Sequence, residues 1–154
     1  MAATSIPMPA ESGISRTLQR IRTEPAYAAF MILRVGFVLL PVVFGLDKFA
    51  NVLTKWEGYL APWVAGLLPF TPHIAMFIVG AVEIAAGIMI AVKPRYAAYV
   101  VAFWLAGIII NLLTYPGFYD VALRDFGLLV AALALAQLAR TFDSGRSGRG
   151  ITQD

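Results

Sequence analysis

The sequence predicts an all-α integral membrane protein, a four-helix bundle with an interfacial amphipathic segment between its first two helices. Hydrophobic residues make up 60% of the 154 residues and charged residues only 14%, whereas about a quarter of the residues of a soluble domain are charged. Long apolar stretches also recur along the chain, and about 20 helical residues are enough to cross the hydrocarbon core of a bilayer. The excess apolar surface is therefore expected to face lipid.

The predicted membrane spans are 27–46, 74–92, 96–115 and about 120–139. Thr71 is the expected N-cap of the second span, because its hydroxyl can accept a hydrogen bond from the first turn. The fourth span has the shortest uninterrupted apolar run, so it must start near Asp120 to be long enough. It then carries Arg124 and Asp125 inside its first turns.

Polar segments flank the spans and predict the domain organisation and the topology. Residues 1–24 and 141–154 are expected to be disordered tails around a transmembrane domain of residues 25–140. Positive charge is concentrated in these tails and in the connection between the second and third spans. Because Lys and Arg accumulate on the cytoplasmic side of a membrane, we expect a multi-pass protein of the cell inner membrane with both termini in the cytoplasm.

The connection between the first two spans, residues 51–70, is too long for a plain turn and is interrupted by two prolines. Its large apolar residues fall at helical spacing: Val52, Leu53, Trp56, Leu60 and Trp63. This pattern fits an amphipathic segment in the outer interface, where tryptophan and tyrosine prefer to lie. The segment would serve either as an anchor in the interface or as a lid over a site between the helices.

The composition also excludes several kinds of chemistry. Without cysteine the chain can form no disulfide, thiolate zinc site or iron–sulfur cluster, and its single histidine, His73, cannot supply two imidazoles to a haem. Metal sites need several converging donors, so no metal site is expected. The net charge of +3 lies in the flanks of the spans and indicates topology, so no nucleic-acid partner is expected.

Ionisable residues inside the spans are the candidate functional residues, because a charge at mid-membrane costs about 2.5 to 3.5 kcal/mol on insertion scales. Arg34 and Glu83 are expected at similar depth, and we predict an ion pair between them. A second polar layer lies toward the outer side and includes Lys48, Asn111, Arg124 and Asp125. These layers would either lock the helices in register or line a small pocket that opens outward.

Three stretches resemble the DoxX-like family of small four-helix membrane proteins. They are RVGFVLLPVVFGLDKF in the first span, GAVEIAAGIMI in the second and YDVALRDFGLLVAALALA in the fourth, and the resemblance covers residues 34–138. It implies that Arg34, Lys48, Glu83 and Asp125 occupy the family's recurring polar positions. It also implies a subunit of quinone-linked thiosulfate oxidation or of membrane complexes handling thiol and oxidative stress. The absence of cysteine departs from the family members that use it.

The favoured function is a membrane subunit of an oxidoreductase system that binds a quinone-like amphiphile, or docks a redox partner, in the outer half of the bundle. The predicted ligand-contacting residues are Lys48, Asn111, Arg124, Asp125, Trp56 and Trp104. No covalently bound cofactor is expected, and the partners would be the lipid bilayer and proteins of such a complex. A small-solute permease, a catalytically silent anchor or assembly subunit, and a homo-oligomer remain open alternatives, and no catalytic residue is assigned.

Overall fold

The computed structural model describes residues 13–143, and within this range all regular secondary structure is helical. Four helices are long and apolar enough to cross a membrane. They are α2 (Pro25–Ala50), α4 (Pro72–Val92), α5 (Pro94–Leu113) and α6 (Tyr119–Phe142). The predicted all-α membrane bundle is therefore confirmed, and the chain is a multi-pass membrane protein.

The helix boundaries follow local sequence signals. The Thr71 hydroxyl accepts a hydrogen bond from the backbone N–H of Ile74 at 3.4 Å, as expected of an N-cap. Lys93 alone separates α4 from α5, because Pro94 occupies the first turn of the next helix. The helix α2 extends four residues beyond the predicted end of its span at position 46, so Lys48 is a helical residue.

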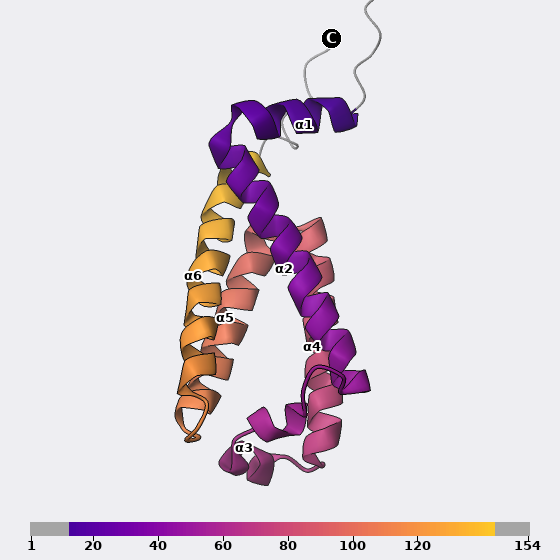
Figure 1. The fold of residues 1–154 in the computed structure, drawn as a ribbon, viewed down its shortest axis with the longest axis vertical. Coiled ribbons are helices and arrows are strands. Elements are labelled where there is room, and N and C mark those ends of the chain that lie inside the picture. Colours follow the sequence, from indigo (N-terminus) through magenta and orange to yellow (C-terminus); the bar gives the residue numbers. More distant parts are fainter. Residues whose placement is uncertain (1–12, 144–154) are drawn as a thin grey trace, which may run out of the picture.

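The predicted disorder of residues 1–24 is wrong for the part of that segment that the structure describes. Residues Gly13–Thr23 form helix α1, which lies across the ends of the transmembrane helices (Figure 1). Its apolar residues Ile14, Leu18 and Ile21 share one face, and Arg16 and Arg20 lie on the opposite face, which gives it an amphipathic character. Residues 1–12 and 144–154 lie outside the described range.

The transmembrane helices form two pairs. Helix α2 packs chiefly against α4, and α5 packs chiefly against α6. Figure 1 shows the two pairs meeting at the end that carries α1 and separating toward the opposite end. We call the first the closed end and the second, which carries the α2–α4 connection and the α5–α6 turn, the open end.

The apolar core lies toward the closed end and is built largely from small residues. Ala98, Ala132, Ala136 and Ala139 are fully buried there around Leu135. Small side chains let helices approach closely, which is how spans associate without a hydrophobic force between them. The core therefore holds the two helix pairs together at one end only.

Glycines bring α2 and α4 into close contact nearer the open end. A Cβ atom placed on Gly45 would lie 2.7 Å from the carbonyl oxygen of Gly80, and one placed on Gly80 would lie equally close to the carbonyl of Gly45. Gly87 is similarly tight against Val42. Only glycine permits this backbone approach, and it fixes the register of the two helices.

The α2–α4 connection folds over the open end. It contains a short 3₁₀ helix, η1 (Trp56–Tyr59), and a six-residue helix, α3 (Pro62–Leu67). The predicted amphipathic segment is thus two short helical pieces, because Pro62 can start a helix but cannot continue one.

The outward surface of the bundle is strongly apolar. Among the exposed large side chains are Ile32, Leu39 and Val43 on α2, Phe103 on α5, and Leu123 and Phe126 on α6. A monomeric soluble protein rarely exposes so much contiguous apolar area. This surface is the one that lipid covers.

Candidate functional site

A pocket of about 640 Å³ lies between the two helix pairs at the open end, beneath the α2–α4 connection. All four transmembrane helices and the connection contribute to its wall. The six residues that the sequence predicted as ligand-contacting all line it: Lys48, Trp56, Trp104, Asn111, Arg124 and Asp125. The structure thus brings these residues together, while their contact with a ligand stays a prediction.

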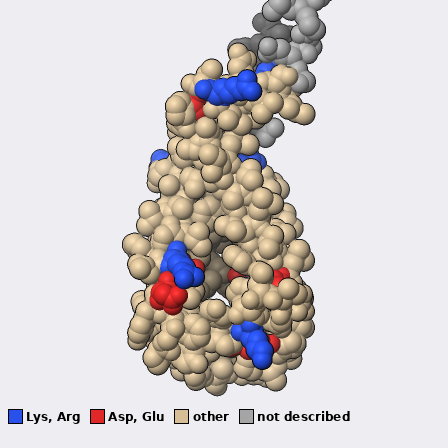
Figure 2. Space-filling view, in the orientation of Figure 1, with Lys and Arg blue, Asp and Glu red and all other residues tan. Residues whose placement is uncertain are grey.

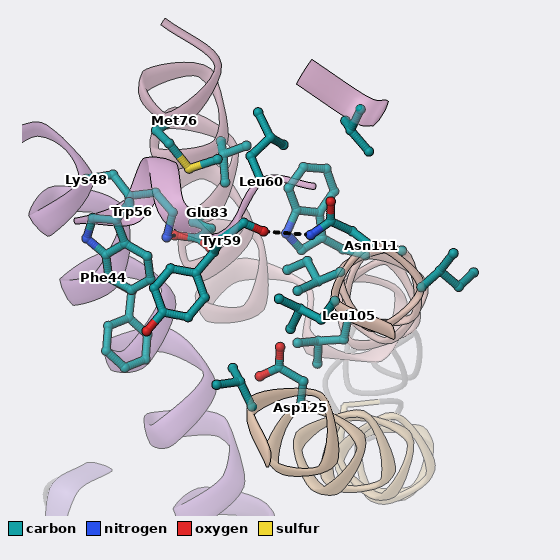
Figure 3. A pocket seen from close by; sticks show the side chains of 18 of the residues that line it. Phe44, Lys48, Trp56, Tyr59, Leu60, Met76, Glu83, Leu105, Asn111 and Asp125 are labelled. Atoms are coloured by element: carbon teal, nitrogen blue, oxygen red, sulfur yellow. Dashed lines mark hydrogen bonds and ion pairs between the residues drawn. The ribbon is translucent and has the colours of Figure 1, made fainter. Parts of the chain in front are cut away.

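The buried ion pair of the pocket joins Lys48 to Glu83. The Lys48 Nζ donates to Glu83 Oε2 at 2.7 Å, and both side chains are mostly buried (Figure 3). The predicted pair between Arg34 and Glu83 is therefore wrong. Arg34 donates instead to the backbone carbonyl of Ala91 in the last turn of α4, where a cation also interacts favourably with the helix dipole.

The antiparallel register of α2 and α4 explains this exchange of partners. The glycine contact sets Gly45 beside Gly80, so Arg34 falls opposite the end of α4. Its partner Ala91 lies about two turns beyond Glu83, roughly 12 Å along the axis at 1.5 Å per residue. Lys48, by contrast, passes directly over Gly80 and its side chain reaches Glu83.

Asp47 anchors the start of the connection next to the pocket. Its carboxylate accepts hydrogen bonds from the backbone N–H groups of Val52 and Leu53, each at 3.1 Å, and from the Trp56 indole at 2.7 Å. The Trp56 ring in turn lies 3.7 Å from the Lys48 Nζ, in a cation–π contact. Asp47 and Trp56 therefore position the lysine.

Asn111 fastens the middle of the connection to α5. Its Nδ2 donates to the Tyr59 carbonyl at 2.8 Å, and its Oδ1 accepts from the Ala61 N–H at 3.0 Å (Figure 3). The side-chain amide is thus occupied by backbone groups, so Asn111 shapes the pocket by holding its cover. A second fastening joins the Trp63 indole to the Thr114 hydroxyl at 2.8 Å.

The far end of the connection is held by Glu57 and His73, whose Oε1 and Nδ1 atoms lie 2.7 Å apart. This hydrogen bond stabilises the carboxylate and lowers the pKa of Glu57 below its usual value. His73, for which the sequence predicted no role in a metal or haem site, therefore helps to fix the cover over the pocket.

Trp104 and Asp125 are polar residues of the pocket wall whose side chains make no hydrogen bond within residues 13–143. The indole nitrogen of Trp104 is buried and makes no hydrogen bond. The Asp125 carboxylate points into the pocket from α6, across from Lys48 and Glu83, and no hydrogen bond from a described residue reaches it (Figure 3). Asp125 therefore offers the pocket an acceptor that makes no hydrogen bond within the described range, and the Trp104 nitrogen is an unused donor buried in the wall.

Arg124 stands at the rim of the pocket. Its side chain is 77% exposed and pairs with Asp120 one turn away, at 3.3 Å. An exposed pair of this kind contributes little to stability. Arg124 is thus available at the mouth, while Asp125 reaches the interior.

Sequence reasoning did not assign Phe44, Tyr59 and Trp63 to the pocket, although all three line it. Phe44 looks like one more lipid-facing residue of an apolar helix. Tyr59 and Trp63 belong to the connection, which periodicity alone places in the interface. Only the lid interpretation of residues 51–70 would have found Tyr59 and Trp63, and the structure favours that interpretation because the connection covers the pocket.

The comparisons with other proteins give no relative to set beside this geometry. No protein-family model, no curated protein and no solved structure matches the chain.

Proposed function

We propose that the chain is a membrane subunit of an oxidoreductase system that binds a quinone-like amphiphile in the pocket at the open end. The observation that carries the proposal is the pocket itself, about 640 Å³ in volume and apolar-walled, with a few polar groups converging on it. Sites for small amphiphilic ligands have this size and this distribution of groups. The resemblance of the sequence to DoxX-like proteins points in the same direction.

The unused polar groups match the head of such a ligand. The Trp104 indole can donate to a carbonyl oxygen, and the Asp125 carboxylate can accept from a hydroxyl group. A quinone presents the first group, and its reduced form presents the second. Trp56 and Tyr59, whose ring centroids are 5.8 Å apart, form an aromatic wall of the same pocket.

The bound quinone would carry the electrons and protons, and the protein would hold and orient it. The Lys48–Glu83 pair keeps a charged, hydrogen-bonded wall inside the bundle, and Lys48 also attracts Asp125 electrostatically. Because these charged side chains are already fixed in place, they can orient the quinone ring without rearranging when it binds. We propose that a separate partner protein oxidises or reduces the bound quinone.

The permease alternative needs a path through the closed end. Residues that are fully buried, such as Ala132 and Leu135, fill that end of the described bundle. A binding pocket that is closed on one side fits this packing better than a solute path does. The silent-anchor alternative predicts that substitutions in the pocket leave activity of the complex unchanged.

We also propose that the closed end faces the cytoplasm of a bacterial-type inner membrane. Basic residues gather there on α1 and around the α4–α5 turn, among them Arg20, Arg22, Lys93 and Arg95. The positive-inside rule assigns such an end to the cytoplasm. The pocket would then open toward the outer leaflet.

Intrinsic fluorescence tests the proposed ligand. The chain has three tryptophans and all of them line the pocket, so a bound quinone should quench them in saturable fashion in detergent or nanodiscs. Asp125→Asn and Trp104→Phe should weaken binding by roughly tenfold and fivefold, the usual scale for losing a charged and a neutral hydrogen bond.

Asp120→Asn is the matched control, because Asp120 is an exposed carboxylate on the same helix. It should bind quinone as the wild type does. Quenching that does not saturate, or equal affinity in all three variants, would refute the proposed site.

A further inference from the structure

A second, smaller hollow continues the pocket toward the middle of the bundle. Its volume is about 70 Å³, and it shares part of its wall with the main pocket, including Glu83, Trp104 and Leu105. Ile108 is also shared, and the other lining residues all have hydrocarbon side chains: Phe37, Leu40, Pro41, Ala86, Val101 and Leu128. We call this hollow the apolar crevice.

The apolar crevice lies where α2 and α6 separate. Leu40 of α2 and Leu128 of α6 both line it, and Leu40 is 43% exposed. Toward the closed end the two helices meet through a cluster of aromatic rings, with Tyr27 and Phe142 at 5.3 Å between centroids. The crevice therefore lies nearer the open end than this seal does.

The molecule is hollowed on this face. Figure 2, in the orientation of Figure 1, shows an opening in the lower half of the molecule, between α6 and α2, with charged side chains beside it. This opening faces sideways, in the direction that lipid occupies around a transmembrane bundle. Phe44 of α2 and Arg124 of α6 both belong to the wall of the main pocket.

The end of the pocket that faces water is covered instead. Asn111 holds Tyr59 and Ala61 of the connection, and Trp63 is fastened to Thr114. A ligand that came from the aqueous phase would have to displace these hydrogen bonds. A ligand already dissolved in the bilayer meets no such cover between α2 and α6.

We infer that the pocket is loaded sideways from the membrane, through the opening between α2 and α6, and that the apolar crevice holds a single hydrocarbon chain attached to the polar head. This inference rests on the proposed function and narrows its ligand class to one-chain amphiphiles. The polar head takes the pocket near Asp125 and Trp104, and the chain passes between Leu40 and Leu128. The narrow crevice disfavours two-chain phospholipids.

Binding of two tritiated quinones to protein in nanodiscs tests the inference, one with a ten-carbon chain and one with no chain, at equal mole fraction in the lipid. The wild type should bind the chain-bearing quinone at least fivefold more tightly. Leu128→Trp and Leu40→Trp fill the crevice and should abolish that preference while leaving affinity for the chainless quinone unchanged. Leu128→Ala is the substitute variant if Leu128→Trp does not fold. It adds no bulk, and it should also reduce the preference for the chain-bearing quinone.

Leu39→Trp and Leu133→Trp are the matched controls, since both leucines are exposed on the same helices and line neither hollow. They should keep the preference. If the chainless quinone binds the wild type but the crevice variants keep the full chain preference, the lateral route is wrong and the proposed function stands. If neither quinone binds the wild type, the proposed function fails and the inference fails with it.

Discussion

Lys48 and Glu83 form an ion pair inside a transmembrane bundle, with the Nζ and Oε2 atoms 2.7 Å apart and side chains only 5% and 14% exposed. Each residue comes from a different helix, so the pair joins α2 to α4 at the edge of the pocket. Buried charges are tolerated when they are paired, and their cost appears when one partner is removed.

Removal of either member of the pair should therefore destabilise the bundle strongly. Lys48→Met or Glu83→Leu leaves one uncompensated charge in the interior, at a cost of about 3 kcal/mol in the free energy of unfolding. The double variant should recover a large part of that loss, which a double-mutant cycle by denaturant titration in micelles would measure. Arg124→Gln breaks only an exposed pair and should change stability little. Additive single effects would contradict the coupling.

The glycine contact between α2 and α4 should not accept even a methyl group. Alanine at Gly45 or Gly80 would bring its Cβ to 2.7 Å from a backbone oxygen, and such overpacking costs about 1 to 3 kcal/mol. Gly36→Ala and Gly127→Ala are the controls, because a Cβ there meets no atom within 4 Å. Alanine is the better helix former, so these controls should be neutral or stabilising in the same unfolding measurement.

Loss of the Asn111 side chain should release the cover of the pocket. Asn111→Ala removes the hydrogen bonds to Tyr59 and Ala61, so the connection should open more often and trypsin should cut after Lys55 about ten times faster. A factor of ten corresponds to about 1.4 kcal/mol, a plausible cost for two hydrogen bonds. Gln137→Ala, which breaks a side-chain hydrogen bond near the closed end, should leave the cleavage rate unchanged.

The contact between Glu57 and His73 should make the cover sensitive to acid. The hydrogen bond lowers the pKa of Glu57, so its stabilising effect is complete above the usual glutamate pKa, about 4.3, and is lost as pH falls through the lowered value. A spin label on a cysteine at Gly58, the first cysteine in this chain, should become mobile in that acidic window. His73→Phe removes the donor, so the label should already be mobile at neutral pH and should show no acid transition. An acid transition that persists unchanged in His73→Phe would show that His73 does not hold Glu57.

Cysteine labelling would also test the proposed orientation. Gly66 is exposed on α3 at the open end, and Lys93 is exposed in the α4–α5 turn at the closed end. A membrane-impermeant maleimide added to intact cells should label Gly66→Cys directly and Lys93→Cys only after permeabilisation. The reverse pattern would place the pocket on the cytoplasmic side.

The sequence was sufficient for the fold because lipid imposes one simple requirement, a long apolar helix, that can be read residue by residue. It also placed Lys48, Asn111 and Asp125 in one polar layer, since their distances from the span ends alone set their depth. It failed on the partner of Glu83, because register depends on the contact of Gly45 with Gly80, which depth does not reveal.

The surface that the α2–α4 connection contacts was the second feature that the sequence could not predict. Periodicity correctly found apolar residues at helical spacing, but it could not tell a surface in contact with lipid from one in contact with a pocket. That distinction depends on Asn111, which is 50 residues away from its partner Ala61 in the chain. Long-range hydrogen bonds of this kind leave no local pattern.

The separation of the alanine-rich core from the pocket has a consequence for how this protein can diverge. The alanine-rich core, which includes Ala132 and Ala136, is at one end, and residues that face the pocket, such as Tyr59 and Asp125, are at the other. Substitutions that alter ligand preference should therefore cost little stability, provided that the Lys48–Glu83 pair is kept. One scaffold of this kind could acquire new lipid-soluble ligands by changing a few side chains while its helices stay as they are.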